Sequence, residues 1–439
     1  MAQRPEDDEG LAVPSRRLGR LARFGGLASG IAGNMLVEGA RTVARGQRPA
    51  LEDLLLTPSN AAKVADQLSQ LRGAAMKVGQ LLSMDAGDLI PPELADILAR
   101  LRAGAHPMPP QQLKAVLNEN WGQGWLRRFS PFETRPIAAA SIGQVHRART
   151  KDGRDLAIKI QYPGVKQSID SDVDNVATLI RISGLLPKGV DVDPLLAEAK
   201  NQLHEEADYE REGRYLEKFR TLLADDERFI VPALHEDFTT PSILAMDYVP
   251  GIPIEEAEHW PQEDRNRVVG HLLDLMLQEL FVFRMMQTDP NFANYQYDED
   301  KGRLVLLDFG ATREFTESLT EGYRAFMKAG MTSDREAIRR AAMELGFLDE
   351  AISQAHQDLL IDIIDTGMES LRVEGPYDFG STDLALRVRE QGIALRTSGF
   401  VHMPPTEALF LHRKFAGIYL LAGRLKAQVD VRALVEKHL

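Results

Sequence analysis

The 439-residue chain contains no cysteine, which excludes disulfides, thiolate catalysis and cysteine-ligated zinc. A chain without cysteine suits a reducing compartment. Cationic residues are also in deficit, since 52 Lys and Arg face 65 Asp and Glu, for a formal net charge of −13. Because phosphate contacts need clustered cations, this balance argues against a nucleic-acid partner.

Long hydrophobic runs are missing as well, since no stretch reaches the roughly 20 apolar residues that a membrane-spanning helix needs. The nearest, residues 24–37, is short, glycine-rich and interrupted by Ser29 and Asn34. Arginines flank it on both sides, at positions 16, 17, 20, 23, 41, 45 and 48. We therefore predict a cytoplasmic protein with no transmembrane helix, in which residues 18–45 make peripheral contact with the inner face of the cytoplasmic membrane. A mobile extension, or a helix docked on its own protein, is an equally weighted alternative.

The hydrophobic fraction of 44% and the charged fraction of 27% are ordinary for a globular protein long enough for more than one core. Apolar periodicity predicts a helical region, then a small strand-rich region, then a mainly helical remainder. The helices expected are residues 59–101, broken at Pro91, and residues 111–118, 173–186 and 194–222. The strands expected are residues 137–149 and 155–161, two within 229–249 around Thr239–Pro241, and 295–297 and 303–307.

Two acidic signatures carry the chemistry. Asp289 is followed five positions later by Asn294, and Asp308, which begins an Asp-Phe-Gly sequence, lies 19 positions after Asp289. This spacing is typical of protein-kinase-like enzymes, in which the first Asp faces the attacking oxygen. The Asn and the second Asp hold the Mg²⁺ that bridges the phosphates of the nucleotide.

A lysine on an upstream strand is expected to contact the nucleotide phosphates. Lys159, within the apolar run 156–160, matches the Val-Ala-Ile-Lys strand of kinases. A lone strand lysine is usually a solvated edge charge, but this one precedes two carboxylate signatures. Its counter-charge is expected from the acidic helix 203–219.

The segment before this lysine is rich in alanine where kinases have a glycine loop. Ala138, Ala139, Ala140 and Ser141 occupy the expected phosphate-covering position. Alanine carries a Cβ that restricts positive φ and close backbone approach to anions, so this segment is predicted to cradle phosphate differently. Gln287-Thr288 replaces the usual His-Arg, and no clear Ala-Pro-Glu follows Asp308. Both differences indicate that a peptide-substrate platform is missing.

With these motifs the chain resembles the UbiB/ADCK atypical kinase family, and most closely the mitochondrial branch and its bacterial relatives. The resemblance covers about residues 59–425. It is carried by a Lys-x-Gly-Gln signature at residues 77–80, the alanine-rich segment at 138–146, a Glu-x-Asp motif at 206–208 followed by Glu212, and the signatures at 286–291 and 307–313.

The resemblance implies an α+β, protein-kinase-like two-lobed fold with an added N-terminal helical extension. The expected domains are a basic, flexible segment (1–50), the helical extension (51–130), the strand-rich N-lobe (131–250) and the helical C-lobe (251–439). It also implies that Glu212 pairs with Lys159. In the family, Lys77 and Gln80 lie over the peptide-entry site of a kinase, and Glu206 and Asp208 contact that layer. Without the family, Lys77 would be interpreted as a lysine snorkelling from an amphipathic helix.

Three functions remain open from the sequence. The favoured one is an enzyme that binds ATP or ADP with Mg²⁺ and supports coenzyme Q biosynthesis by ATP hydrolysis or small-molecule phosphorylation, with a quinone-precursor lipid and lipid-biosynthetic enzymes as partners. A Ser/Thr protein kinase and a nucleotide-binding pseudokinase scaffold are the alternatives. Zinc is not expected, because no histidines have ligand spacing. Arg413 and Lys414 lie in a family-like stretch and are expected to be solvated or to form a structural ion pair.

Overall fold

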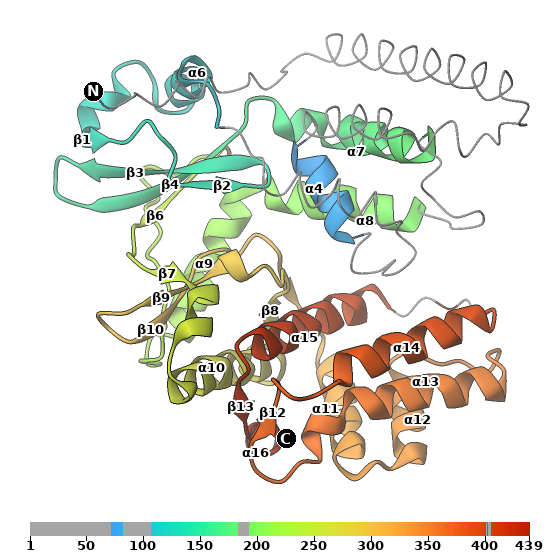
Figure 1. The fold of residues 1–439 in the computed structure, drawn as a ribbon. Helices are drawn as coiled ribbons and strands as arrows, with labels where there is room; N and C mark the ends of the chain where they lie inside the picture. Colours follow the sequence, from blue (N-terminus) through green and yellow to red (C-terminus); the bar gives the residue numbers. More distant parts are fainter. Residues whose placement is uncertain (1–71, 82–106, 183–192, 401, 403–404) are drawn as a thin grey trace, which may run out of the picture. The chain divides into compact units, whose positions relative to one another are not determined.

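A computed structural model describes residues 72–81, 107–182, 193–400, 402 and 405–439. The described chain divides into two compact units. The first comprises the described residues up to Arg214 together with Ala233–Tyr248, and the second comprises Tyr215–Pro232 and Val249–Leu439. The first is rich in strands and the second mainly helical (Figure 1). The α+β class predicted from the sequence is therefore confirmed. The segments 1–50 and 59–71, with the predicted helix at 93–101, lie outside the described residues.

The first unit contains a five-stranded antiparallel sheet of β1 (Phe129–Phe132), β2 (Ala138–Ala140), β3 (Gly143–Thr150), β4 (Asp155–Gln161) and β6 (Ile243–Asp247). Strand β4 matches the predicted bounds and lies between β3 and β6. The single strand predicted over 137–149 is wrong, because a two-residue turn at Ser141 and Ile142 divides it into β2 and β3. The two strands predicted within 229–249 are confirmed, since β5 (Phe229–Ile230) and β6 lie on either side of Thr239–Pro241, but β5 belongs to the second unit and does not pair with β6.

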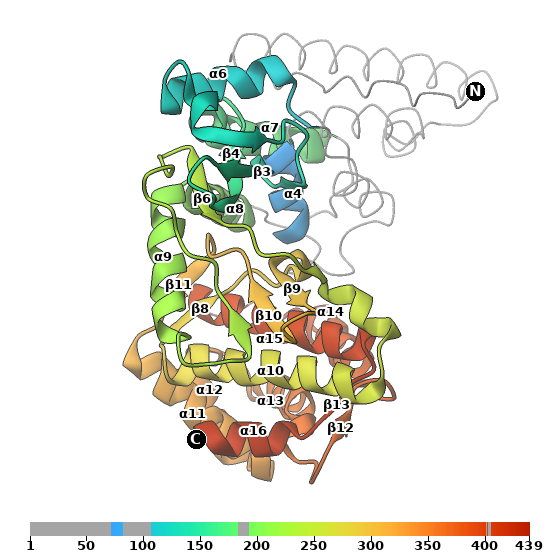
Figure 2. The ribbon, with the colours of Figure 1, turned by 90° about the vertical axis from the view of Figure 1, so that its left-hand side faces the viewer.

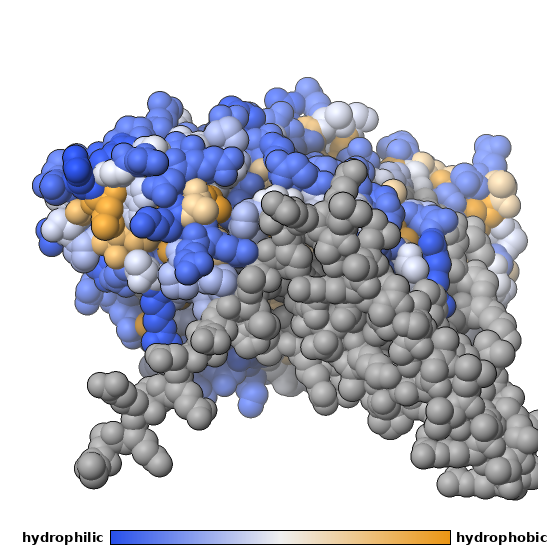
Figure 3. All heavy atoms as spheres, turned by 90° about the horizontal axis from the view of Figure 1, so that it is seen from above, coloured by the Kyte–Doolittle hydropathy of each residue, from blue (hydrophilic) through white to orange (hydrophobic). Residues whose placement is uncertain are grey.

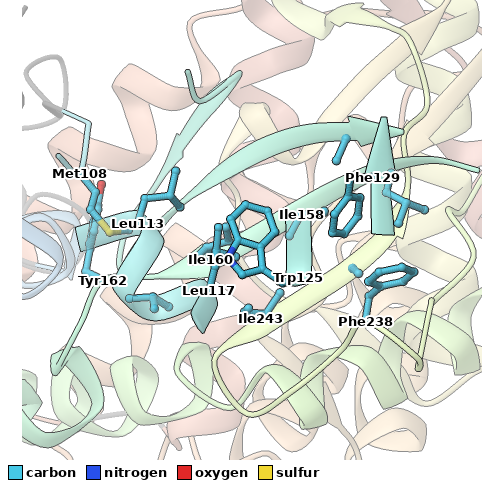
Figure 4. Packing of buried hydrophobic residues seen from close by; sticks show 14 residues of the cluster. Met108, Leu113, Leu117, Trp125, Phe129, Ile158, Ile160, Tyr162, Phe238 and Ile243 are labelled. Atoms are coloured by element: carbon cyan, nitrogen blue, oxygen red, sulfur yellow. The ribbon is translucent and has the colours of Figure 1, made fainter. Parts of the chain in front are cut away.

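An aromatic and aliphatic core covers one face of this sheet (Figure 4). Helix α6 (Pro110–Trp121) begins with proline at its first position, where a missing N–H costs nothing, and contributes Leu113 and Leu117. Trp125, from the short helix η3 (Trp125–Arg128), packs among them with Ile158 and Ile160 of β4. This packing fixes β4, and with it the position of Lys159.

Helices α4 (Arg72–Leu81), α7 (Val165–Ile182) and α8 (Asp193–Glu206) pack together in the first unit (Figure 1). Helix α9 (Tyr209–Leu222) carries the chain from the first unit into the second. The single helix predicted over 194–222 is wrong, because the chain breaks at Ala207 and Asp208, between α8 and α9.

The second unit is built around α10 (Gln262–Phe281), whose second half is almost entirely buried. A sheet of β5, β10 (Arg303–Leu306), β9 (Tyr295–Asp298) and β7 (Ile252–Pro253), and a ribbon of β8 (Met285–Gln287) with β11 (Thr312–Glu314), carry the acidic signatures. Strands β9 and β10 lie within a residue of their predicted bounds. They form an antiparallel hairpin with Tyr295 opposite Leu306.

Further helices complete the second unit, and Figure 2 shows α16 and the β12–β13 ribbon beside α10. These elements are α11 (Glu317–Thr332), α12 (Arg335–Glu344), α13 (Gln354–Gly367), η6 (Glu369–Leu371), β12 (Tyr377–Asp378), α14 (Leu384–Thr397), α15 (Thr406–Arg424), β13 (Gln428–Val429) and α16 (Val431–His438). Within the described ranges, no helix combines the length and the hydropathy needed to cross a membrane. On the face drawn in Figure 3, the described surface is mainly hydrophilic, and its hydrophobic residues form small separate groups.

Candidate functional site

Lys159 and Glu212 form a buried ion pair in the first unit. The Nζ atom of Lys159 donates to both carboxylate oxygens of Glu212, at 2.8 and 3.0 Å. The Glu212 side chain is 1% exposed and that of Lys159 is 11% exposed. Because a buried ammonium needs a carboxylate partner, the pair holds the lysine head group in one place. Glu212 is thus the member of the acidic helix that pairs with the strand lysine.

The position of Lys159 follows from the central place of β4 in the sheet. Its backbone lies opposite Val145 of β3 on one side and Leu244 of β6 on the other. Strand β4 is buried along nearly its whole length, as expected for a strand covered on both faces. A lysine in such a strand cannot remain a solvated edge charge, which excludes the simpler interpretation of Lys159.

The alanine-rich segment forms a hairpin with β3. Ala138, Ala139 and Ala140 pair with Val145, Gln144 and Gly143, and Ser141 begins the turn. The hydroxyl of Ser141 donates to Glu206 Oε2 at 2.5 Å. A Cβ on Gly73 of α4 would lie 2.7 Å from the carbonyl oxygen of Ser141, so only glycine lets α4 approach the turn this closely.

Lys77 of α4 pairs with the same glutamate. Its Nζ lies 2.5 Å from Glu206 Oε1, and the Lys77 side chain is 2% exposed. This burial excludes a lysine that snorkels into water. Asp208 accepts a hydrogen bond from the Arg211 N–H at 2.9 Å and thereby caps the start of α9. The side chain of Gln80 lies outside the described part of the structure.

In the second unit, Asp289, Asn294 and Asp308 lie around one end of the β9–β10 hairpin. Asn294 Nδ2 donates to Asp289 Oδ2 at 3.3 Å. The Asn294 carbonyl accepts from the Leu307 N–H at 3.1 Å, and Asp308 is the next residue. The backbone pairing of β9 with β10 thus places the amide and the second carboxylate at the same end of the hairpin.

The donor set at this hairpin end fits Mg²⁺. Since Asn294 uses its amide nitrogen for Asp289, its Oδ1 is the atom able to bind a cation, and Asp308 adds a carboxylate. Mg²⁺ takes oxygen ligands and is usually held by one or two carboxylates together with substrate phosphates and water. Among the described residues, no group of three or more His, Cys, Asp or Glu has the arrangement of a metal site. Two protein ligands plus phosphates do not require such a group.

The two acidic segments are tied to each other by strands. Gln287 of β8 pairs with Thr312 of β11, which places the residues leading into Asp289 beside those that follow Asp308. Thr288, in the position of the kinase arginine, donates its hydroxyl to the Ala311 carbonyl at 2.8 Å. The altered pair Gln287-Thr288 therefore connects the two segments.

Sequence reasoning assigned no role to Lys414, which is buried in this unit. Its side chain is 2% exposed, and its Nζ donates to Gln287 Oε1 at 3.1 Å and to the Tyr295 hydroxyl. Glu279 Oε2 lies 3.8 Å from the same Nζ. Lys414 falls three residues after Leu411 and four before Ile418, both buried on α15. A lysine on an apolar helix face is the signal that predicts its burial.

Burial acts on both members of this pair. It raises the pKa of Glu279 to about 7, against the opposing effects of Lys414 and of the Gln287 N–H. Burial disfavours the ammonium form of Lys414, but attraction to Glu279 and Tyr295 more than offsets this and raises its pKa. The lysine is therefore charged.

The amino-acid sequence matches a known protein family and is similar to several characterised relatives. The profile of the ABC1 atypical kinase-like domain matches residues 100–342. The chain is 39% identical to the "Atypical kinase COQ8, mitochondrial" of Saccharomyces cerevisiae over 97% of this chain and 85% of that one. It is also 39% identical to the "Atypical kinase COQ8B, mitochondrial" of Rattus norvegicus, over 97% and 80% of the two chains.

Among solved structures, one from Mycobacterium tuberculosis is similar to this chain over most of both chains. The structure of Rv3197 with erythromycin, from Mycobacterium tuberculosis, has a TM-score of 0.60 and 26% identity. The similarity covers 86% of this chain and 96% of the other.

Proposed function

The chain belongs to the ABC1 atypical kinase-like family with the kinase-like fold predicted from its sequence, and we propose that it binds Mg-ATP and catalyses phosphoryl transfer. Lys159 would bind phosphate oxygens, with Glu212 as its counter-charge, and Asn294 and Asp308 would hold Mg²⁺. The strongest support comes from the two hydrogen bonds of Asn294. Its side-chain amide donates to Asp289, and its backbone carbonyl accepts from Leu307, the residue before Asp308.

The chemistry of these side chains consists mainly of positioning and charge neutralisation. Phosphoryl transfer needs little covalent work from the protein, because the metal and cations stabilise charge on the phosphate oxygens. Asp289 would orient a water molecule or a hydroxyl group as the attacking nucleophile. Its hydrogen bond from Asn294 couples the base to the metal ligand.

We further propose that α4 restricts the acceptors that can react. Lys77 and Gly73 tie α4 to Glu206 and to the alanine-rich turn, where Ala138–Ala140 and Ser141 are the proposed nucleotide-covering segment. This arrangement favours ATP hydrolysis or small-molecule phosphorylation over phosphorylation of proteins. Gln80 and Asp208 are proposed to take part in the same restriction.

The pathway proposed is coenzyme Q biosynthesis, with a quinone-precursor lipid and lipid-biosynthetic enzymes as partners. Support comes from the family resemblance and from relatives named COQ8. Location in the cytoplasm, with membrane contact through residues 18–45, also remains a proposal, and that segment lies outside the described residues. Deletion of the gene, followed by measurement of cellular quinones, tests the pathway. Normal ubiquinone would remove this assignment and leave the nucleotide site standing.

Purified protein should hydrolyse ATP slowly in the presence of Mg²⁺. Asp308→Asn removes a metal-binding carboxylate and Lys159→Met removes the phosphate-binding cation, so each should lower turnover by about 10²-fold or more. Asp300→Asn and Lys151→Met are matched controls, because Asp300 is an exposed residue in the β9–β10 turn, at the end of that hairpin away from Asp308, and Lys151 is an exposed residue in the turn between β3 and β4. Undiminished turnover in Asp308→Asn or Lys159→Met would reject the site.

The same assay separates the two alternatives. Mg-dependent thermal stabilisation by ATP without any product would favour a pseudokinase scaffold. Strong labelling of other proteins in a lysate would favour a Ser/Thr protein kinase.

A further inference from the structure

A buried lysine on α15 contacts the chain on both sides of the Asp289–Asn294 segment. Lys414 Nζ donates to the side chain of Gln287, two residues before Asp289, and to the hydroxyl of Tyr295, the residue after Asn294. A single ammonium group thereby connects the two ends of the segment that carries the proposed base and one proposed metal ligand.

Glu279 of α10 completes the arrangement. Its Oε1 accepts from the Gln287 N–H at 3.4 Å, and its Oε2 lies 3.8 Å from Lys414 Nζ. The carboxylate therefore holds the backbone of Gln287 while the ammonium holds its side chain. Both charged side chains are 2% exposed, so water does not screen their attraction.

Stability alone does not account for these charges. Replacing a buried ion pair with apolar residues of similar volume often leaves stability unchanged or raises it. Glu279 Oε2 and Gln287 Nε2 are buried and have no hydrogen-bond partner among the described residues, which is a further cost. An arrangement that is costly for folding, and that surrounds a functional segment, indicates a role in the geometry of that segment.

Two other contacts hold α15 to the same region. A Cβ on Gly417, one turn after Lys414, would lie 2.4 Å from the Pro290 Cβ, so the helix backbone packs directly on the segment. One turn before Lys414, the Phe410 ring lies 3.8 Å from the guanidinium carbon of Arg313 in β11. Three successive turns of α15 thus contact the segments that follow or flank Asp289 and Asp308.

We propose that Lys414 is a positioning residue for phosphoryl transfer, which with Glu279 fixes the Asp289–Asn294 segment through Gln287 and Tyr295. The inference rests on the proposed function, because it concerns the same site. Small displacements of a base or a metal ligand lower the rate without removing the nucleotide-binding groups. The predicted signature is a loss in kcat with little change in the KM for ATP.

The first test compares Lys414→Met with the wild-type full-length protein. We expect kcat for ATP hydrolysis to fall on the order of 10²-fold, with KM changed less than about threefold. Hydrogen exchange, followed by mass spectrometry on peptides covering 285–298, should become faster. Wild-type kcat, or wild-type exchange in these peptides, would overturn the proposal.

A double variant separates positioning from folding. Lys414→Met leaves the buried Glu279 carboxyl without its partner and lowers Tm, whereas Glu279→Gln with Lys414→Met replaces that carboxyl with a neutral amide and should restore Tm. The links to Gln287 and Tyr295 stay broken, so kcat should stay low. Recovery of kcat together with Tm would show that Lys414 acts only in folding and would reject the positioning role.

Lys437→Met is the matched control. Lys437 pairs with Asp274, which like Glu279 is a 2% exposed carboxylate on α10, and Asp274 retains Arg228 and His438 as partners. The kcat of the Lys437→Met protein should equal that of the wild type, even if its Tm is lower. Loss of kcat in this control would mean that any weakened α10 ion pair slows the enzyme, which overturns the specific role of Lys414.

The exchange measurement keeps this inference separate from the proposed function. If wild-type protein turned over no ATP, the proposed function would fail, while exchange of peptides 285–298 would still report whether Lys414 holds the segment. If Asp308→Asn abolished turnover but Lys414→Met did not change it, only the present inference would fail.

Discussion

Glu206 joins three parts of the first unit through one carboxylate. One oxygen pairs with Lys77 of α4 and the other accepts from Ser141 of the alanine-rich turn. Glu206 is itself the last residue of α8. Hydrogen bonds to charged groups stabilise by about 1.5–3 kcal/mol, roughly twice the value for neutral pairs. The attachment of α4 to the turn should therefore depend strongly on this residue.

Glu206→Gln removes the negative charge beside Lys77 and should weaken α4 docking by about 1.5–3 kcal/mol. Ser141→Ala removes one donor and leaves the ion pair, so its effect should be smaller, about 1 kcal/mol. Hydrogen exchange of the peptide covering residues 72–81 measures both. Glu210→Gln, an exposed glutamate in the first turn of α9, is the control. Equal exchange in Glu206→Gln and Glu210→Gln would contradict the role of Glu206.

At the residue scale, the sequence predicted pairs whose members lie in recognisable motifs. The family resemblance predicts Glu212 as the partner of Lys159 and both Glu206 and Asp208 as carboxylates beside Lys77; the structure forms the Glu212 and Glu206 contacts, whereas Asp208 accepts from the Arg211 N–H. The roles of these residues stay predictions. The Lys414–Glu279 pair was missed because its members are 135 positions apart in the sequence (414 − 279). They lie on two helices, and apolar periodicity does not show that these helices pack together.

Asp208 lies at the break between helices α8 and α9. Its carboxylate accepts from the Arg211 N–H, so the side chain satisfies one of the N–H groups left unpaired at the start of α9. The apolar pattern continues across the break, and periodicity therefore predicted one helix over 194–222. A side chain that hydrogen-bonds the backbone locally competes with a continuous helix.

Asp208→Ala should lower the free energy of unfolding by about 1 kcal/mol, whereas Asp208→Asn should cost only a few tenths because asparagine also caps helices. Urea unfolding of the three proteins measures the difference. A loss as large in Asp208→Asn as in Asp208→Ala would mean that the charge, and not the cap, is the stabilising feature.

Element bounds were predictable where one physical signal dominated. Strand β4 matched its predicted bounds because a continuous apolar run ends at turn residues on both sides. The segment before it was not divided correctly, because alanine, serine and isoleucine give no strong turn signal at Ser141 and Ile142. The tertiary contact of Ser141 with Glu206 supplies information that the local sequence lacks.

At the scale of the whole molecule, each unit carries some of the residues that are proposed to act. The first carries Lys159, Glu212 and the Glu206 contacts, and the second carries Asp289, Asn294, Asp308 and the Lys414 network. Kinase spacing made Lys159 and the Asp289, Asn294 and Asp308 signatures predictable, because phosphate and Mg²⁺ demand particular residue types. The role proposed for the Lys414 network is positioning alone, so no ligand chemistry marks these residues in the sequence.

The central claim is that Asn294 and Asp308 hold the metal of a bound nucleotide. Anomalous diffraction from crystals grown with Mn²⁺ and a non-hydrolysable ATP analogue tests it most directly. We predict one Mn²⁺ peak at about 2–2.3 Å from Asn294 Oδ1 and from a carboxylate oxygen of Asp308, the range for hard cations and oxygen. The peak should disappear in Asp308→Asn. A nucleotide-associated peak on other residues, or one unchanged in Asp308→Asn, would contradict the account.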